Sequence, residues 1–239
     1  MKERADKVLA DKGLAATRSQ AKSLIENGDV QVNGIVIKKA GELIDPAADI
    51  KVTSQLYVGR GALKLVEALS QFQISPKDKI FLDVGASTGG FTEVLLNHGA
   101  VKVYAIDVGH DQLAPKLRED PRVINLEGHN IRELASLPDL AEGAVMDLSF
   151  ISITKVLDAV KNLLKPGSPL IALVKPQFEA GRERLPKDGV IKDRKVQEEV
   201  LKEVLTFAEA NGWKHLKSID SPIEGKSGNK EFLSWLVRS

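Results

Sequence analysis

Apolar positions near the amino terminus follow the spacing of two short helices. The two groups are Ala5, Val8 and Leu9, and then Ala21, Leu24 and Ile25. Gly13 favours an end to the first helix, and Thr17 with Gln20 forms a capping-box pair at the start of the second. The pair Asn27-Gly28 favours the end of the second helix. The pattern therefore predicts two small helices at the start of the chain.

A β-hairpin is expected directly after these helices. Val30-Gln31-Val32 alternates into Asn33-Gly34, and Ile35-Val36-Ile37 follows. An Asn-Gly pair between two apolar runs is a strong signal for a type I′ turn, because both turn residues must take positive φ. Residues 1–54 are thus expected to form a small α+β domain. Residues 55–61 are expected to form a linker, in which two glycines precede the next helical pattern.

Strand and helix patterns alternate through the rest of the chain, residues 62–239. Strands are expected near 79–84, 101–107, 122–126, 142–148, 169–175, 214–220 and 230–237, and helices near 61–72, 89–98, 111–119, 151–163 and 192–211. Such alternation predicts an α/β domain whose largely parallel sheet has helices on both faces. The last two strands are expected to form an antiparallel pair. In such folds ligands bind beyond the carboxyl ends of the strands.

A glycine-rich turn closes the first of these strands and reads Asp83-Val84-Gly85-Ala86-Ser87-Thr88-Gly89-Gly90-Phe91-Thr92. A P-loop would need lysine where Phe91 stands, and a dinucleotide fingerprint would need glycine where Ser87 stands. One acidic residue, Asp83, precedes the turn, and another, Asp107, ends the next strand. These features favour an adenosyl site without a pyrophosphate cradle. A plain turn between strand and helix is the simpler alternative.

Composition narrows the chemistry further. The chain has 239 residues and 43% hydrophobic content, which is enough for packed cores. It has no cysteine, and its four histidines lack ligand spacing, so neither thiolate chemistry nor a metal is expected. The amino terminus lacks an apolar signal region and no segment is long enough to cross a membrane, so a cytoplasmic protein without membrane contact is expected. With a net charge of +1, any affinity for nucleic acid must come from local patches.

Charged residues end two further predicted strands. Asp147 follows the fourth strand in Met146-Asp147-Leu148-Ser149-Phe150, and Lys175 ends the apolar run 170–174. An unpaired buried lysine would be costly, so Lys175 should have partners, with Asp147, Glu231 and Lys64 as candidates. The glycine-rich turn resembles motif I of the class I S-adenosylmethionine-dependent methyltransferases. Members of that class that methylate an adenine amino group typically have an Asp/Asn-Pro-Pro-aromatic run at this place, and no Pro-Pro follows Asp147, so an amine is disfavoured as methyl acceptor. A lysine beside carboxylates can instead orient a ribose hydroxyl and take its proton.

The first part of the chain carries a specific pattern of residues that extends over most of residues 1–54. It reads Arg4-x-Asp6-Lys7, then Gly13-Leu14-Ala15-x-Thr17-Arg18-Ser19-x-Ala21, then Leu24-Ile25-x-x-Gly28-x-Val30-x-Val32-Asn33-Gly34. This order resembles the S4 RNA-binding domain. The resemblance implies RNA contacts by Arg4, Arg18, Ser19, Lys22, Lys38 and, after the domain, Arg60. Residues 1–54 hold nine Lys and Arg against eight Asp and Glu, so a solvated, protein-binding domain is the alternative.

Four residues of the second part resemble the Lys-Asp-Lys-Glu tetrad of the FtsJ-like ribose 2′-O-methyltransferases. They are Lys64, Asp147, Lys175 and Glu231. Together with the S4-like segment, the whole chain resembles the TlyA (hemolysin A) family of ribosomal RNA methyltransferases. The resemblance implies a Rossmann-like class I methyltransferase sheet and a ribose 2′-hydroxyl of a ribosomal RNA cytidine as methyl acceptor. It also implies that Lys175 acts on that hydroxyl while the other three residues hold it in place.

The same resemblance implies S-adenosylmethionine as cofactor and a ribosomal subunit as partner. The glycine-rich turn corresponds to motif I of the class I methyltransferases, and Asp107 is placed to accept hydrogen bonds from the cofactor's ribose. The candidate cofactor contacts are Asp83, Gly85, Ser87, Thr88, Gly89, Gly90, Asp107, Val108, Asn130 and Asp147.

Two other functions are compatible with parts of this pattern. A ribosome-assembly factor could keep both domains and lack catalysis. A membrane-lytic toxin would agree with the hemolysin label of the family, but the sequence shows neither a secretion signal nor an apolar membrane span.

Overall fold

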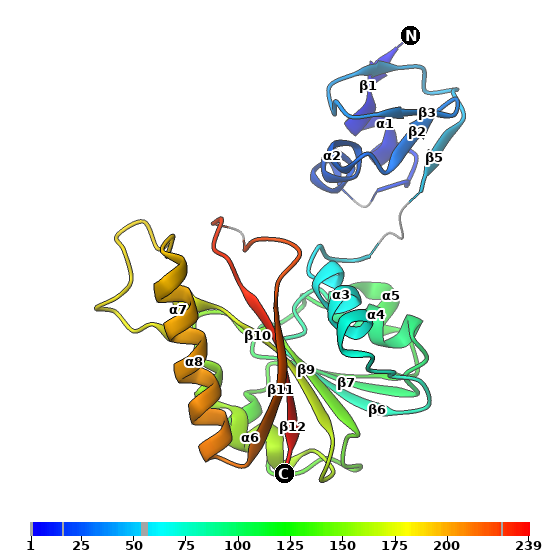
Figure 1. The fold of residues 1–239 in the computed structure, drawn as a ribbon. Helices are drawn as coiled ribbons and strands as arrows, with labels where there is room; N and C mark the ends of the chain where they lie inside the picture. Colours follow the sequence, from blue (N-terminus) through cyan, green and yellow to red (C-terminus); the bar gives the residue numbers. More distant parts are fainter. Residues whose placement is uncertain (1, 16, 54–56, 226) are drawn as a thin grey trace. The chain divides into compact units, whose positions relative to one another are not determined.

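The computed structural model describes residues 2–15, 17–53, 57–225 and 227–239. The chain forms two compact units, Met1–Val58 and Gly59–Ser239 (Figure 1). Gln55 and Leu56, the first residues of the predicted linker, lie outside the described residues. No helix in the described part of the chain combines the length and the apolar character needed to cross a membrane.

The first unit contains the two predicted helices and the predicted hairpin. Its elements are β1 (Glu3–Arg4), α1 (Ala5–Asp11), α2 (Arg18–Asn27), β2 (Val30–Val32), β3 (Ile35–Ile37), β4 (Leu43–Ile44) and β5 (Ile50–Val52). Asn33 and Gly34 have φ of 51° and 78°, as the predicted type I′ turn requires. The Thr17 hydroxyl accepts a hydrogen bond from the Gln20 backbone N–H and so caps α2.

The second unit is built on a seven-stranded sheet with the order β11-β12-β10-β9-β6-β7-β8. Its strands are β6 (Ile80–Val84), β7 (Lys102–Asp107), β8 (Val123–Glu127), β9 (Gly143–Met146), β10 (Pro169–Val174), β11 (Trp213–Asp220) and β12 (Phe232–Arg238). β12 runs antiparallel to both its neighbours, whereas β6 to β10 are mutually parallel. The prediction of a largely parallel sheet with an antiparallel final pair is confirmed.

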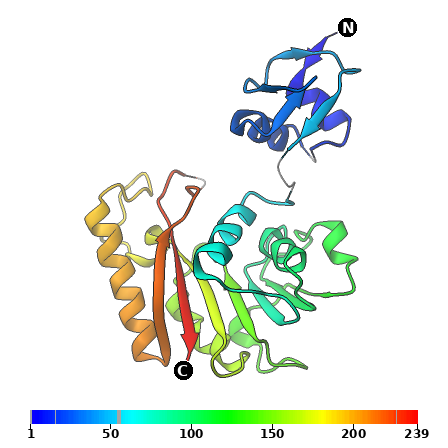
Figure 2. The same ribbon diagram turned by 45° about the vertical axis from the view of Figure 1, so that its right-hand side comes forward.

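Helices cover both faces of this sheet (Figures 1 and 2). One face carries α3 (Ala62–Phe72), α4 (Gly90–Asn97) and α5 (Pro115–Arg118), and the other carries α6 (Leu157–Asn162) and α8 (Arg194–Ala210). Strand residues such as Leu82, Ile106 and Met146 share an apolar core with Val160 and Val204 of α6 and α8. Successive side chains of a strand point to opposite faces, so Asp83 lies on the α4 side.

Two predicted helices are shorter in the structure. The helix expected over 111–119 is limited to α5, because Asp111 takes a positive φ of 54° and Pro115 occupies the first turn. The helix expected over 151–163 is divided into a 3₁₀ turn, η2 (Ile153–Lys155), and α6. Ser152 caps η2 by accepting a hydrogen bond from the Thr154 N–H. The structure also adds η1 (Ile131–Glu133) and α7 (Pro176–Glu179).

Candidate active site

Four charged side chains that are far apart in the sequence meet at the carboxyl edge of the parallel strands. Asp147 follows β9, Lys175 follows β10, and Lys64 lies in the first turn of α3. Glu231 directly precedes β12, which runs antiparallel to β10. The first residue of β12 pairs with the last residue of β10, so Glu231 reaches the same edge. The sheet topology thus explains how a residue preceding a strand joins residues that follow strands.

The four side chains form a chain of alternating charges. Lys64 Nζ lies 2.6 Å from Glu231 Oε2 and 4.0 Å from Asp147 Oδ2. Lys175 Nζ lies 2.5 Å from Asp147 Oδ1 and donates a 3.0 Å hydrogen bond to Ser149 Oγ. Among the described residues, Asp147 Oδ1 has no hydrogen-bond partner of suitable geometry, so its contact with Lys175 is an ion pair.

Burial makes this pairing necessary. Lys64, Lys175 and Glu231 are 6%, 7% and 4% exposed. Removing one partner from a buried pair leaves an uncompensated charge, which is costly. Two lysines and two carboxylates together balance the charge of the cluster. Lys175 stands where β10 gives way to α7, so its Nζ is held at the edge of the sheet.

The glycine-rich turn packs directly against the loop that carries Asp147. Gly85 has φ of +88°, and a Cβ on it would lie 2.6 Å from the Asp147 carbonyl oxygen. Gly89 has φ of +91°, and a Cβ there would lie 2.3 Å from Leu117 of α5. Both positions therefore require glycine for backbone conformation and for close packing. Glycine here brings the turn against its neighbours, beside the charged cluster.

Asp83 is fully buried beneath this turn. Its Oδ2 accepts a 2.6 Å hydrogen bond from the Thr92 hydroxyl, while Oδ1 has no partner among the described residues. Burial raises the pKa of Asp83 to about 7, with the nearby Asp147 and Asp107 adding to the rise and the Thr92 hydrogen bond opposing it. A carboxyl with one unpartnered oxygen thus lies next to the turn.

Asp107 is oriented by backbone groups at the end of β7. Its Oδ2 accepts from the Ser87 N–H at 2.8 Å, and its Oδ1 accepts from the Gly109 N–H at 2.7 Å. Each carboxylate oxygen can accept a further hydrogen bond. The neighbouring Val108 is 70% exposed. Asp107 is thus a fixed carboxylate that can accept hydrogen bonds from hydroxyl groups, and Val108 beside it is an exposed apolar side chain. The two fit the ribose and the base of an adenosyl group.

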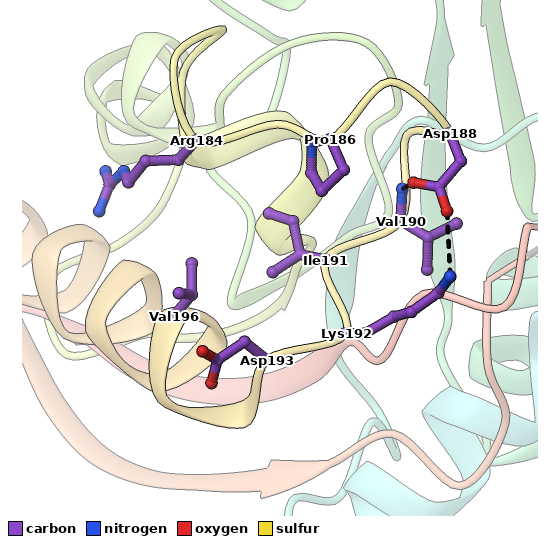
Figure 3. A pocket seen from close by; sticks show the side chains of 8 residues that line it. All are labelled: Arg184, Pro186, Asp188, Val190, Ile191, Lys192, Asp193 and Val196. Carbon is purple, nitrogen blue, oxygen red and sulfur yellow. Dashed lines mark hydrogen bonds and ion pairs between the residues drawn. The ribbon is translucent and has the colours of Figure 1, made fainter.

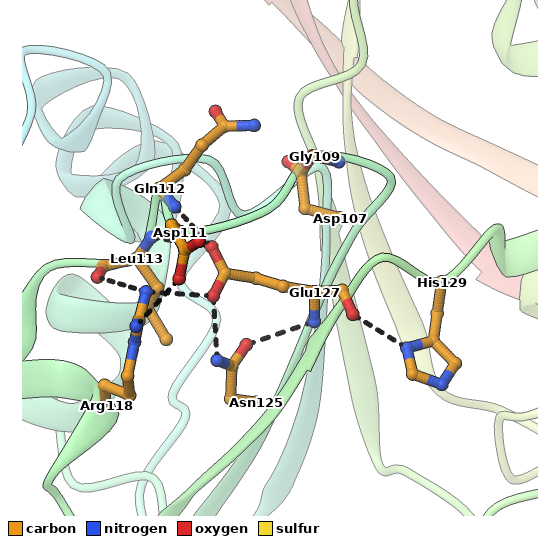
Figure 4. A network of polar contacts seen from close by, with 9 residues as sticks. All are labelled: Asp107, Gly109, Asp111, Gln112, Leu113, Arg118, Asn125, Glu127 and His129. Carbon is orange, nitrogen blue, oxygen red and sulfur yellow. Dashed lines mark hydrogen bonds and ion pairs between the residues drawn. The ribbon is translucent and has the colours of Figure 1, made fainter.

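A polar network ties this edge to β8 (Figure 4). Glu127 Oε1 accepts from the backbone N–H groups of Gln112 at 2.6 Å and Leu113 at 2.9 Å, and Oε2 accepts from Arg118 at 3.1 Å. Burial raises the pKa of Glu127, but its hydrogen bonds outweigh that effect and leave the pKa lowered. Ser87 Oγ donates to Gln112 Oε1 at 3.2 Å. Glu127 therefore fixes the loop that meets the glycine-rich turn.

Two other candidate cofactor contacts, Asn130 and Thr88, make hydrogen bonds within the protein. Asn130 Oδ1 accepts from the Arg132 N–H and caps η1, and Asn130 Nδ2 donates to Glu133 at 3.1 Å. Its side chain is therefore engaged locally. The Thr88 carbonyl accepts a 3.2 Å hydrogen bond from the Ala114 N–H, which joins the glycine-rich turn to the start of α5.

Comparison with known proteins gives this site a family. The sequence matches the family described as FtsJ-like methyltransferase over residues 57–238 and the S4 domain over residues 3–50. A Mycobacterium tuberculosis protein named 16S/23S rRNA (cytidine-2′-O)-methyltransferase TlyA is 42% identical over 240 residues, covering 98% of this chain and 89% of its own length. The chain belongs to the TlyA (hemolysin A) family of FtsJ-like methyltransferases.

Two further relatives agree with this membership. The Bacillus subtilis protein YqxC, provisionally named an rRNA methyltransferase, is 47% identical over 97% of this chain and 84% of its own length. A solved structure from Streptococcus thermophilus, provisionally named a hemolysin, is 43% identical with a TM-score of 0.77, and the match covers 100% of this chain and 89% of that one. The prediction of an S4 domain followed by a class I methyltransferase fold is confirmed.

The candidate RNA contacts of this TlyA-family chain are all exposed. They are Arg4, Arg18, Ser19, Lys22 and Lys38 in the first unit and Arg60 in the second. Lys22 lies 3.7 Å from Glu26 one helical turn away, an exposed pairing that leaves it free to move. Arg4 and Arg18 instead share a buried acceptor, Asp6.

Phe150 is a conspicuous feature of the TlyA-family site that sequence patterns did not single out. It lies three residues after Asp147, is 91% exposed, and takes a φ of +65°. Its ring centroid lies 5.2 Å from that of Phe178, and Lys175 Nζ lies 5.8 Å from the Phe178 centroid. A strained backbone that exposes a large aromatic side chain points to a binding role.

A separate pocket forms in the loop between α7 and α8 (Figure 3). It is lined by Arg184, Pro186, Asp188, Val190, Ile191, Lys192, Asp193 and Val196. No tetrad residue and no candidate cofactor contact lines it. The pocket is therefore distinct from the candidate active site of this methyltransferase.

Proposed function

We propose that this chain transfers a methyl group from S-adenosylmethionine to a ribose 2′-hydroxyl of a cytidine in the ribosomal RNA of ribosomal subunits. The observation that carries the proposal is the buried cluster of Lys64, Asp147, Lys175 and Glu231 beside the glycine-rich turn. The name of the M. tuberculosis relative supports the nucleoside and the class of RNA. The S4 domain supports RNA as the partner.

The residues around the turn fit an adenosyl cofactor. Asp107 would accept hydrogen bonds from its ribose hydroxyls, and Val108 would contact its base, since one is a fixed acceptor and the other an exposed apolar side chain. Asp83 and the backbone of residues 85–90 would line the remaining length. The bound cofactor supplies an electrophilic methyl group.

Lys175 is the residue we assign to the acceptor hydroxyl. Lys175 would first release its own ammonium proton to solvent. The neutral amine would then hold the 2′-hydroxyl in line for attack and take the hydroxyl proton. Asp147, 2.5 Å away, would stabilise the ammonium that this proton transfer restores, and Ser149 fixes the direction of the amine. Lys64 and Glu231 would hold Asp147 in place, because Lys64 contacts both carboxylates.

Phe150 offers a stacking surface for the base of the target nucleotide. Replacing Phe150 by alanine is expected to lower kcat/KM for RNA by roughly 10- to 100-fold, because stacking of one base on an aromatic side chain contributes about 1–3 kcal/mol. Phe150→Tyr keeps the ring and should retain most activity. Cofactor affinity, measured by calorimetry, should be the same in both variants. An alanine variant with unchanged kcat/KM would rule out stacking.

The proposed reaction is tested by transfer of labelled methyl from S-adenosylmethionine to unmodified 30S and 50S subunits, followed by alkaline hydrolysis. A 2′-O-methyl group blocks cleavage at its own phosphodiester, so label is expected in alkali-resistant dinucleotides. Label in alkali-labile mononucleotides would contradict ribose methylation. Cofactor binding without transfer to either subunit would instead favour the non-catalytic assembly factor.

A further inference from the structure

The carboxylate of Asp6 in α1 is saturated with hydrogen bonds. Arg4 donates to it through Nε and Nη2, each at 3.0 Å, and Arg18 donates through Nη2 at 3.0 Å. The Lys7 backbone N–H adds a fourth bond at 2.9 Å. Asp6 is 6% exposed, so the acceptor is buried while the two guanidinium groups converge on it from outside.

Both arginines nevertheless face solvent. The side chains of Arg4 and Arg18 are 52% and 56% exposed. A guanidinium has five N–H donors, of which Arg4 gives two to Asp6 and Arg18 gives one. A Cβ at Gly41 would lie 3.1 Å from Arg4 Nη1, so glycine there leaves room for the guanidinium. The pair therefore keeps exposed donors whose directions are already fixed.

We propose that Asp6 is a positioning residue that holds Arg4 and Arg18 as a preorganised pair for phosphate groups of the RNA. This inference rests on the proposed function, because it takes RNA as the partner of the S4 unit. Arginine binds phosphate through paired N–H donors with defined geometry. Ordering a free arginine on binding costs affinity, and Asp6 removes that cost by ordering two arginines beforehand.

If only the charge of Asp6 mattered, its removal would have the opposite effect on RNA binding. A carboxylate near a polyanion repels it, so removing the charge should strengthen binding. The Arg4 hydrogen bonds, assisted by Arg18 and opposed by burial, lower the pKa of Asp6 to about 2, so the carboxylate is charged throughout the working pH range. Positioning and repulsion therefore predict opposite signs for the same substitution.

The test compares Asp6→Asn with Asp11→Asn in the full-length protein. Asp11 lies on the same helix, is 63% exposed, and contacts Lys7 rather than either arginine, so both variants change the net charge equally. Affinity for unmodified 30S and 50S subunits is measured across a salt series. Asp6→Asn is expected to bind about tenfold more weakly with a shallower salt dependence, whereas Asp11→Asn should bind as well as wild type or more tightly.

A mutant cycle shows whether Asp6 acts through the arginines. In an Arg4→Gln/Arg18→Gln background, Asp6→Asn should weaken binding no further. The methylation rate of Asp6→Asn at saturating subunits should equal that of wild type, so the substitution should raise KM and leave kcat unchanged. Equal loss in both backgrounds, or an Asp6→Asn variant that binds as tightly as Asp11→Asn, would overturn the proposal.

A second variant keeps the test valid if Asp6→Asn disturbs folding. Asp6→Glu retains the charge but moves the carboxylate by one methylene, which prevents the same three arginine contacts. It should also bind subunits more weakly than wild type, and equal binding would refute positioning. If wild type itself binds neither subunit, the proposed RNA partner fails, which is a different result from loss in the variants alone.

Discussion

Lys175→Ala is expected to reduce single-turnover methyl transfer to subunits by about 10²- to 10⁴-fold, the range of a lost general acid or base. Lys175 is 7% exposed, and its amine is held by Asp147 and Ser149 at the end of β10. The affinity for S-adenosylmethionine should be unchanged. The variant therefore separates the chemical step from cofactor binding.

Lys214→Ala is the matched control for this prediction. Lys214 is an exposed lysine on the edge strand β11, so its loss changes the net charge equally without touching the charged cluster. Rates are compared at saturating cofactor and subunits. A Lys175→Ala rate within tenfold of the control would mean that Lys175 does not act on the hydroxyl, and the role of the cluster would have to be structural.

Part of this site follows from sequence because parallel strands end at one edge. Asp83, Asp107, Asp147 and Lys175 each lie at or near the carboxyl end of a predicted strand, so their gathering follows from the strand–helix alternation. The alternation gives no reason for Glu231 to join them. Its place depends on the antiparallel pairing of β12 with β10, which sets the register of the two strands. For Glu231, family resemblance was the stronger guide.

Other features of the structure could not be predicted from sequence patterns. β1, β4 and β5 have two or three residues each, which is too short for alternation to be detected. The positive φ of Phe150 depends on the tertiary packing of its loop, since phenylalanine does not favour that conformation. The Glu127 network joins residues that are 14 and 15 positions apart, and each would read as an ordinary loop or strand residue. Hydrogen bonds between loops of this kind require the folded structure.

Asp83 provides the second large effect, through the pH dependence of stability. Its folded pKa is raised to about 7, mainly by burial and further by Asp147 and Asp107, although the Thr92 hydrogen bond lowers it. In the unfolded chain an aspartate has a pKa of about 3.9. The folded state therefore binds the proton more tightly. Stability falls as the pH rises from about 4, and the loss is complete above the folded pKa.

Asp83→Asn is expected to remove this loss, because asparagine stays neutral and can still accept the Thr92 hydrogen bond. Between pH 5 and pH 8, wild type should lose on the order of 3 kcal/mol relative to the variant, since each pH unit below the folded pKa corresponds to ~1.4 kcal/mol. For a domain of this size, the difference in Tm between Asp83→Asn and wild type, measured by calorimetry, should change by roughly 5–10 °C between pH 5 and pH 8.

Asp158→Asn is the control for this prediction. It replaces a 72% exposed aspartate of α6 and should follow wild type at both pH values. Parallel pH dependence of Asp83→Asn and wild type would show that Asp83 is charged in the folded protein across this range, so that its burial is offset by contacts stronger than the Thr92 hydrogen bond.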